Sequence, residues 1–246
     1  MHRFFVDEAG FQDGTACLEE NDARHARRVL RLRPGEEVVL MDGARRFRAQ
    51  ILEEQEEKVR CALLEELPST EAALKITLFQ GLPKAEKMEW IVQKLTELGA
   101  VAVVPVAMER CVARLTAQDG EKKRERWQKI VREAAKQSGR TVTPRVGCPQ
   151  RFEAMLEELR GFDAALIPWE EARGYGPLQF SRDFPRARHV ALVVGPEGGM
   201  SPEEVARMEE AGARRITLGP RILRTETAGL VAAAALLALY GEMDTM

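Results

Sequence analysis

The sequence has few of the residues that bind metal ions or form disulfide cross-links. It has three histidines and four cysteines, and Cys17, Cys61, Cys111 and Cys148 lie far apart along the chain. There is no CxxC pair, and no histidine lies at ligand spacing from a cysteine. We therefore expect reduced thiols, no disulfide framework and no zinc or other metal site.

Long apolar runs are also missing. The longest, Ala228 to Tyr240, is shorter than the roughly 20 residues that cross a bilayer. The opening MHRFFVDEAG has no apolar segment of signal-peptide length. We expect a cytoplasmic protein without a membrane partner.

A strong charge of one sign is absent as well. The 37 Lys/Arg and 39 Asp/Glu residues give a formal net charge of −2. No global field draws the chain towards nucleic acid, so any basic binding surface must be local. Residues 1–70 are acidic on balance, with 11 Lys/Arg against 15 Asp/Glu. The 246 residues are enough for one large domain or two small ones with a sizeable core.

Residues 1–70 have the pattern of a small β-rich unit. RRFRAQILEE alternates apolar and polar residues as a half-buried strand does, and the Asp-Gly turn of MDGARR precedes it. We expect Glu37–Met41 and Phe47–Leu52 to pair as a hairpin, with Lys58–Leu64 as a third strand. The composition changes at Pro68–Ala72, which is our candidate linker.

From Leu74 onward strands alternate with helices, which favours an α/β domain over residues 71–246 with helices on both faces of a parallel sheet. The expected strands lie in LKITLFQGLP, VAVVPVAM, FDAALIPWE, HVALVVGPEGG and RRITLGPRIL. The expected helices are KAEKMEWIVQKLTELG, Asp119–Ser138 and Phe152–Leu159. We expect residues 107–120 and 171–188 to be loops.

The stretch GPEGGMSPEE is a glycine-rich turn between a strand and a helix. It matches neither the dinucleotide fingerprint GxGxxG nor the P-loop GxxxxGK[ST], because Glu197 stands where a glycine is needed and no lysine follows. A carboxylate opposes polyphosphate and favours a neutral or cationic ligand. A plain turn before a helix capped by Ser201, Pro202 and Glu204 explains the same residues equally well.

Two further strands end in open turns, at Pro168 and at Gly219. Ligands of open parallel sheets bind at the carboxyl ends of the strands, so the three turns could form one pocket. Leu218 and Leu223 would supply apolar sides, and Gly195 would allow close approach. Such a pocket suits a flat, uncharged base better than a triphosphate.

Together, GPEGGMSPEE and LGPRILRTETA resemble the SPOUT class of RNA methyltransferases, and more narrowly the bacterial 16S rRNA uridine-N3 methyltransferase family. HARRVLRLRPGEEV, QGLPKAEKMEWIVQKLTELG, REAAKQSGR and the opening RFF also fit, so the resemblance covers nearly the whole chain. It implies a C-terminal deep trefoil knot in residues 71–246, a PUA-like β-barrel RNA-binding domain in residues 1–70, and a homodimer.

The resemblance also implies an S-adenosyl-L-methionine site and methylation at N3 of a specific uridine in 16S (small-subunit) ribosomal RNA. The cofactor-binding residues, carried over by position, are Ile167, Pro168, Gly195, Glu197, Gly198, Leu218, Gly219 and Leu223. The sulfonium is a cation, which agrees with a carboxylate in the turn. Whether Glu197 faces the sulfonium or caps the helix stays open.

A run of arginines is the candidate RNA surface. On one helix, Arg24, Arg27, Arg28 and Arg31 would share a face, while Ala26, Val29 and Leu30 would point the other way. Arg3 and Arg33 are further candidate contacts. A solvated helix face is the alternative, but the acidic background and the resemblance favour phosphate binding. Lys84, Lys87 and Lys94 form a weaker second basic face.

Methyl transfer to uridine N3 requires that its proton leave, so a base or a cation that stabilises the resulting oxyanion is needed. Arg224 follows the third turn directly and is our candidate for orienting or stabilising the substrate; Arg140 in QSGR is a second cation. Thr225 and Glu226 are also ordinary helix-start residues. His189 begins a buried strand, and we expect it to be structural.

The segment Thr225–Tyr240 is apolar nearly all round, which indicates burial within the domain or against a partner and agrees with a homodimer. Two other functions are weighed. One is an RNA-binding ribosome-assembly factor without methyl transfer. The other is a nucleotide hydrolase, which Glu197 and the missing lysine disfavour.

Overall fold

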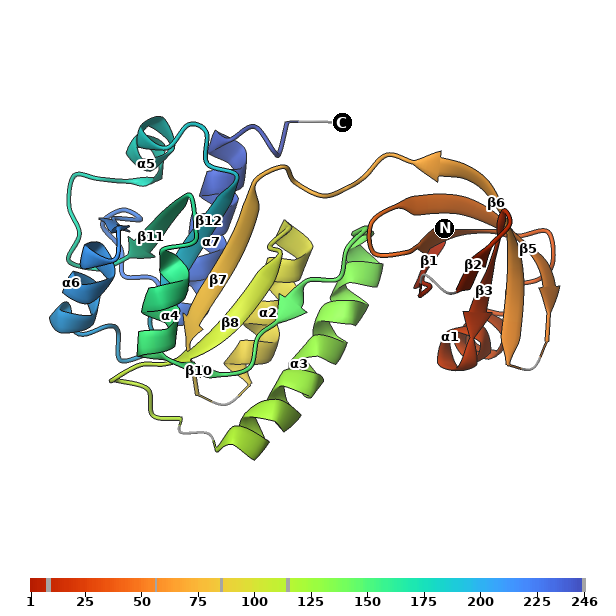
Figure 1. The fold of residues 1–246 in the computed structure, drawn as a ribbon, viewed down its shortest axis with the longest axis horizontal. Helices are drawn as coiled ribbons and strands as arrows, with labels where there is room; N and C mark the ends of the chain where they lie inside the picture. The colour runs from red at the N-terminus through yellow and green to blue at the C-terminus, as the bar shows by residue number, and fades with distance from the viewer. Residues whose placement is uncertain (8–9, 56, 85, 114–115, 245–246) are drawn as a thin grey trace. The chain divides into compact units, whose positions relative to one another are not determined.

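The computed structural model describes residues 1–7, 10–55, 57–84, 86–113 and 116–244 (Figure 1). Its contacts divide into two compact units. The first comprises Met1–Glu71 and Ala135–Thr143, and the second comprises Ala72–Ala134 and Pro144–Met246. The long helix α3 (Ala117–Ser138) therefore begins in the second unit and ends in the first.

The first unit is built on a six-stranded sheet in the order β1-β4-β5-β6-β3-β2. Its strands are β1 (His2–Phe5), β2 (Phe11–Gln12), β3 (Thr15–Glu19), β4 (Glu37–Met41), β5 (Arg46–Glu54) and β6 (Lys58–Leu67). Among the strands of the described residues, β1 and β4 pair in parallel and the other neighbours pair antiparallel. The expected hairpin is confirmed as β4 and β5, because alternate residues such as Ala49 and Ile51 face the core and the Asp-Gly turn joins the strands.

The arginine-rich segment of this unit is not one continuous α-helix, so the expected arginine face is wrong in part. The helix α1 (Glu20–Arg24) changes into a π-helix, η2 (His25–Val29), in which Leu30 N–H donates to the His25 carbonyl, five residues back, at 3.0 Å. The wider turn alters the angle between successive side chains. As a result Val29 is 65% exposed, and Arg31 lies beyond the helix with a left-handed φ of 57°.

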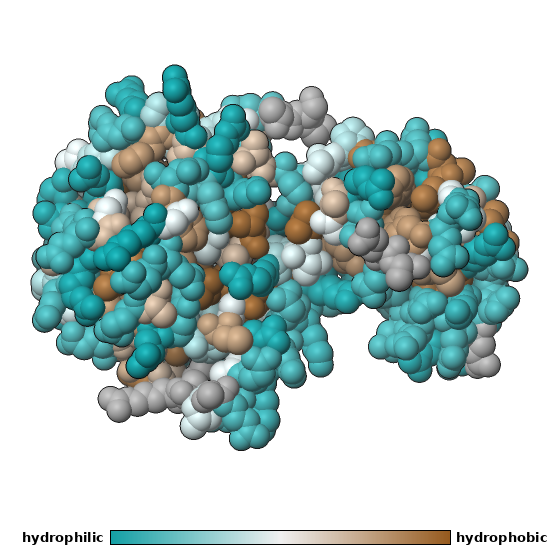
Figure 2. Space-filling model, viewed as in Figure 1, coloured by the Kyte–Doolittle hydropathy of each residue, from teal (hydrophilic) through white to brown (hydrophobic). Residues whose placement is uncertain are grey.

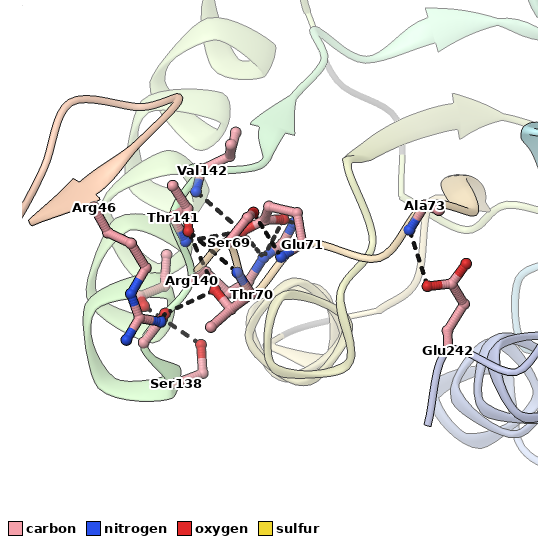
Figure 3. Close-up of polar contacts among 12 residues, drawn as sticks. Arg46, Ser69, Thr70, Glu71, Ala73, Ser138, Arg140, Thr141, Val142 and Glu242 are labelled. Atoms are coloured by element: carbon pink, nitrogen blue, oxygen red, sulfur yellow. Dashed lines mark hydrogen bonds and ion pairs between the residues drawn. The ribbon is translucent and has the colours of Figure 1, made fainter. Parts of the chain in front are cut away.

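Figure 3 shows the polar contacts around Glu71 at the end of the first segment. The Glu71 carboxylate accepts hydrogen bonds from the Arg140 guanidinium at 3.1 Å and from the backbone N–H groups of Thr141 and Val142 at 2.9 and 3.0 Å. The side chain of Arg140 is 5% exposed. This buried ion pair joins Ala135–Thr143 to the rest of the first unit, and it explains why Arg140 is not available as a catalytic cation.

The second unit is a seven-stranded sheet in which every pairing is parallel. Its order is β10-β8-β7-β12-β11-β13, with β9 beside β8. The strands are β7 (Lys75–Gly81), β8 (Ala102–Ala107), β9 (Arg145–Val146), β10 (Gln150–Arg151), β11 (Ala164–Pro168), β12 (His189–Val194) and β13 (Ala213–Ile216). The five strands expected from the sequence are confirmed as β7, β8, β11, β12 and β13.

Helices cover both faces of this sheet (Figure 1). Besides α3 they are α2 (Lys87–Leu98), α4 (Phe152–Leu159), α5 (Pro177–Asp183), α6 (Pro202–Glu210) and α7 (Thr225–Leu239). Residues of α2, α3, α5 and α7 pack with Leu78 and Leu192 on one face, whereas α4 and α6 pack with Phe79 and Val193 on the other. Successive strand residues thus enter opposite layers, as the nearly continuous apolar strands predict.

The expected loop at 171–188 is wrong in part, because it contains α5, which begins with Pro177 in its first turn. In the other expected loop, 107–120, α3 begins at Ala117, and residues 114–115 lie outside the described part.

Hydrophilic side chains cover most of the face drawn in Figure 2. Among the described residues, no helix is long and apolar enough to cross a membrane.

His189 lies at the start of β12, as expected of a structural residue. Its Nε2 is 2.9 Å from Thr77 Oγ1. The centroid of its ring lies 4.4 Å from the centroid of the Phe162 ring. Burial lowers the pKa of His189 below its ordinary value of 6.5, and the charge of Lys75 adds to the effect. The imidazole is therefore neutral in the folded protein at neutral pH.

This lowered pKa predicts a pH-dependent stability. Below pH 6.5 the unfolded chain binds more protons at His189 than the folded protein does, so the free energy of unfolding falls as the pH drops. We expect His189→Gln to show a shallower fall than the wild type between pH 7.5 and 5.5 in urea denaturation. Identical pH slopes for the two proteins would contradict the assignment.

Candidate functional site

Three turns lie side by side at the carboxyl edge of the parallel sheet. β11 pairs with both β12 and β13, so their carboxyl ends share one edge. The turns that follow are 168–174 after β11, 195–201 after β12 and 217–224 after β13. This edge is where open parallel sheets bind ligands.

Two adjoining cavities lie between these turns. The larger, of about 700 Å³, is lined by the turns after β11 and β13, and the smaller, of about 460 Å³, by the turn after β12 and the start of α7. They share five lining residues: Pro168, Glu170, Ile222, Leu223 and Ala228. The cavities are therefore two parts of one hollow.

Seven of the eight residues expected to bind the cofactor line this hollow. Pro168 and Leu223 line both parts. Gly195, Glu197 and Gly198 line the smaller part, while Leu218 and Gly219 line the larger. The eighth, Ile167, is fully buried in the core under α4 and α6, so its side chain lies behind the wall rather than in it.

Glu197 does not cap α6. Ser201 is the N-cap of that helix, and its side chain forms a capping box with Glu204, as the sequence predicted. The Glu197 carboxylate instead accepts the backbone N–H of Lys84 at 3.0 Å and pairs with Lys87 Nζ at 3.2 Å. Burial alone would raise the pKa of Glu197, but backbone hydrogen bonds and the Lys87 ammonium outweigh it, so the pKa lies below its ordinary value.

Arg224, Thr225 and Glu226 occupy the start of α7 and have separate partners. Arg224 is the exposed N-cap residue and lines the smaller cavity. Thr225 is buried, and its hydroxyl donates to the Gly195 carbonyl at 2.6 Å. Glu226 pairs with Lys87 Nζ at 3.1 Å, and that ammonium helps to lower its pKa against the opposing effect of burial. Of these three residues, Arg224 is the exposed cation at the smaller cavity.

The residues expected to bind RNA all belong to the first unit. Arg24, Arg28, Arg31 and Arg33 are exposed, and Arg27 is partly buried beside Glu54. Arg33 also pairs with Glu54, at 2.8 Å. Arg3 is engaged elsewhere, since it donates to the Gln137 carbonyl at 2.9 Å and its guanidinium packs against Gly139.

Sequence reasoning missed several residues of the site. Gln80 and Lys87 contact its turns from the end of β7 and the start of α2, and the Glu170 carboxylate lines both cavities. From the sequence alone, Lys87 belongs to the weaker second basic face with Lys84 and Lys94. The one indication in the sequence is spacing. Lys87 precedes the core residue Ile91 by one helical turn, so its side chain lies beside the buried face of the helix.

The cysteines and the acidic side chains were considered as a possible metal or thiol site. All four cysteines carry free thiols, and burial raises the pKa of Cys61 to about 12. Within the described residues, no group of three or more His, Cys, Asp or Glu side chains could hold a metal ion.

Known proteins are similar to this chain in sequence and in fold. The sequence model of one protein family, the RNA methyltransferase domain, matches residues 70–237. The sequence model of a second family, the RNA methyltransferase PUA domain, matches residues 18–64. The "Ribosomal RNA small subunit methyltransferase E" of Bacillus subtilis is 36% identical over 246 residues, or 96% of each chain. The same-named protein of Mycobacterium tuberculosis is 34% identical over 98% of this chain and 93% of its own.

Solved structures of methyltransferases have a similar fold. The Neisseria gonorrhoeae enzyme of that name, bound to S-adenosyl methionine, is 33% identical with a TM-score of 0.84 over 98% of both chains. A Legionella pneumophila methyltransferase with the same cofactor is 32% identical with a TM-score of 0.82 over 96% of both. The resemblance read from GPEGGMSPEE and LGPRILRTETA is thereby confirmed, and the chain belongs to the RNA methyltransferase family.

Proposed function

We propose that the protein transfers the methyl group of S-adenosyl-L-methionine to N3 of a uridine in small-subunit (16S) ribosomal RNA. The observation that carries the proposal is the two-part hollow at the carboxyl edge of the sheet, walled by seven of the eight expected cofactor residues. The relatives named above support the cofactor and the RNA class, because their names state methylation of small-subunit ribosomal RNA and one of them binds S-adenosyl methionine.

The hollow suits this cofactor in shape and charge. Leu218 and Leu223 offer apolar walls for a flat base, and a Cβ on Gly219 would meet no protein atom within 4 Å. Glu170 is exposed and lines both parts, and a carboxylate there would attract a sulfonium or ammonium group. Glu197 is already paired with Lys87, so Glu170 is the better candidate for facing the cation. When bound, the cofactor supplies the electrophilic methyl group.

Arg224 is the residue we propose to act on the substrate. A uridine that loses its N3 proton carries negative charge on its carbonyl oxygens, and a cation beside them lowers the barrier. We expect Arg224→Met to reduce kcat by about 10- to 150-fold, equivalent to one hydrogen bond to a charged group. KM for the cofactor should change little. Arg224→Lys should recover part of the loss, and an unchanged kcat in Arg224→Met would reject the role.

The remaining parts of the proposal rest on the family. We propose residues 1–70 as a PUA-like barrel that binds RNA through the arginines of 24–33 and Arg3, and residues 71–246 as a SPOUT domain whose turns are knotted. The bond between Thr225 and the Gly195 carbonyl holds the turn after β12 against the start of α7 in this proposed domain. A ribosomal substrate supports a cytoplasmic location.

A homodimer is part of the same proposal. The side chains of Val231 and Leu239 on α7 are each 40% exposed, and Leu178 on the neighbouring α5 is 51% exposed. These apolar side chains support a partner subunit over α7. Light scattering should give about twice the 27.6 kDa mass of one chain. A mass near 27.6 kDa in dilute solution would reject the dimer.

The activity is tested with labelled S-adenosylmethionine and RNA or subunits that lack the modification, followed by nucleoside mass spectrometry. Label on N3-methyluridine supports the proposal, and label on a ribose rejects the proposed position. Binding of RNA with no methyl transfer and no calorimetric signal from the cofactor would instead indicate an assembly factor.

A further inference from the structure

The end of β7 lies directly against the Gly195 turn. A Cβ placed on Gly81 would lie 2.6 Å from Pro196 N and 2.9 Å from Gly195 C, closer than real side chains approach. Position 81 therefore accepts only glycine without a shift of the turn. The backbone of β7 supports this wall of the smaller cavity from behind.

A buried amide next to it joins two walls of the site. Gln80 is 0% exposed, and its Nε2 lies 2.8 Å from Thr225 Oγ1 and 3.3 Å from the Gly195 carbonyl. Its Oε1 is buried without a hydrogen-bond partner among the described residues. An unpaired buried acceptor is destabilising, so Gln80 is a poor choice for stability alone. Its donor group, by contrast, holds the turn after β12 and the start of α7 together.

Lys87 joins the same two walls at the surface. Its ammonium lies 3.2 Å from Glu197 in the turn after β12 and 3.1 Å from Glu226 in the first turn of α7. Lys87 is the first residue of α2, where a positive charge is unfavourable for the helix dipole. The lysine thus contributes little to its own helix and instead links the turn after β12 to the first turn of α7.

We propose that Gln80, Gly81, Lys84 and Lys87, which we call the junction clamp, hold the Gly195 turn and the start of α7 at the spacing that cofactor binding requires. Gln80 and Lys87 are positioning residues, since they act through Gly195, Thr225, Glu197 and Glu226. The inference rests on the proposed function, and it assigns to the β7–α2 connection a role in the site.

Gln80→Leu separates this role from a structural one. The substitution removes an unpaired buried acceptor, which is favourable, and the donors to the Gly81, Gly195 and Thr225 oxygens, which is unfavourable, so the free energy of unfolding should change little. Affinity for S-adenosylmethionine, measured by calorimetry, should nevertheless fall about tenfold, within the range for residues of one network. A variant that binds the cofactor as tightly as the wild type would overturn the proposal for Gln80.

Lys87→Met should weaken cofactor binding about tenfold as well. The matched control is Lys94→Met, because Lys94 is on the same helix and pairs with Glu97 at 2.8 Å, within the helix. The control should bind normally, and Lys87→Arg should recover part of the loss. If Lys87 acts through the carboxylates, Lys87→Met should cost nothing further in the Glu197→Gln/Glu226→Gln double variant. A full additional loss there would show direct action on the ligand and overturn the proposal.

Hydrogen exchange distinguishes failure of the clamp from failure of the proposed function. In ligand-free protein, Lys87→Met and Gln80→Leu should raise the exchange rates of amides in 195–200 and 225–228, whereas Lys94→Met should not. Unchanged rates would overturn the clamp even if the wild type binds the cofactor. Raised rates in a protein that binds no cofactor would uphold the clamp and reject the function.

Discussion

A Gly219→Val variant is expected to lose measurable affinity for S-adenosylmethionine while its affinity for RNA stays near that of the wild type. Gly219 lines the larger cavity, and no protein atom would lie within 4 Å of an added Cβ. A branched side chain would therefore occupy space that the cofactor needs. Calorimetry with the cofactor and a filter-binding assay with RNA measure the two affinities separately.

Backbone strain is the competing explanation, and the chain contains a matched control for it. Gly219 has φ of +100°, and Gly212, in the turn between α6 and β13, has φ of +99° with equally open surroundings. Valine at either position costs about 1–3 kcal/mol in strain. Gly212→Val lies outside the hollow, so it should lose similar stability and keep the cofactor. Equal loss of binding in both variants would attribute the effect to strain.

The reciprocal variant tests whether the two activities are separate. Replacing Arg27, Arg28 and Arg31 together with glutamate should remove most RNA affinity, because the change reverses charge on the proposed phosphate-binding surface. Cofactor affinity should remain unchanged. If this variant and Gly219→Val each lose both activities, the two sites are not independent.

The largest expected effect on stability comes from Arg140. Arg140→Met leaves the Glu71 carboxylate, 18% exposed, without its cation, and removal of one partner from a buried ion pair costs about 3–5 kcal/mol. Because the N–H groups of Thr141 and Val142 still donate to Glu71, we expect the lower end of this range. Urea denaturation measures the loss.

An exposed ion pair provides the comparison. Arg126 Nη2 lies 2.7 Å from Glu89 Oε1, but the arginine side chain is 62% exposed. Arg126→Met should therefore lower the free energy of unfolding by no more than about 1 kcal/mol. Adding Glu71→Gln to Arg140→Met should recover part of the loss, since no unpaired charge then remains. If Arg140→Met is no more destabilising than Arg126→Met, the buried pair does not hold its unit together.

Features with a local cause were predictable from the sequence. Gly99 ends α2 in the left-handed conformation, and Ser201 with Glu204 starts α6, because each depends on residues within one turn. Three strands that end in open turns were enough to place Gly195, Leu218 and Leu223 around one hollow, since parallel strands share an edge.

Features that depend on distant partners were not predictable. Nothing near Lys87 in the sequence indicates that its ammonium lies between Glu197 and Glu226. Nothing near Arg140 indicates Glu71. The change from α1 to η2 was missed for another reason: helical periodicity assumes one constant turn, and the π-helix breaks that assumption within five residues.

The path of the chain between its two units limits how they can be separated. It passes from the first unit to the second after Glu71, returns at Ala135 along α3, and leaves again after Thr143. A protease cut after Glu71 would leave the units covalently joined through α3. An isolated fragment of residues 1–71 would lack the partners of Arg3, Asp22 and Glu71. The first unit is therefore not a detachable module, and the RNA binding proposed for it must be studied in the intact chain.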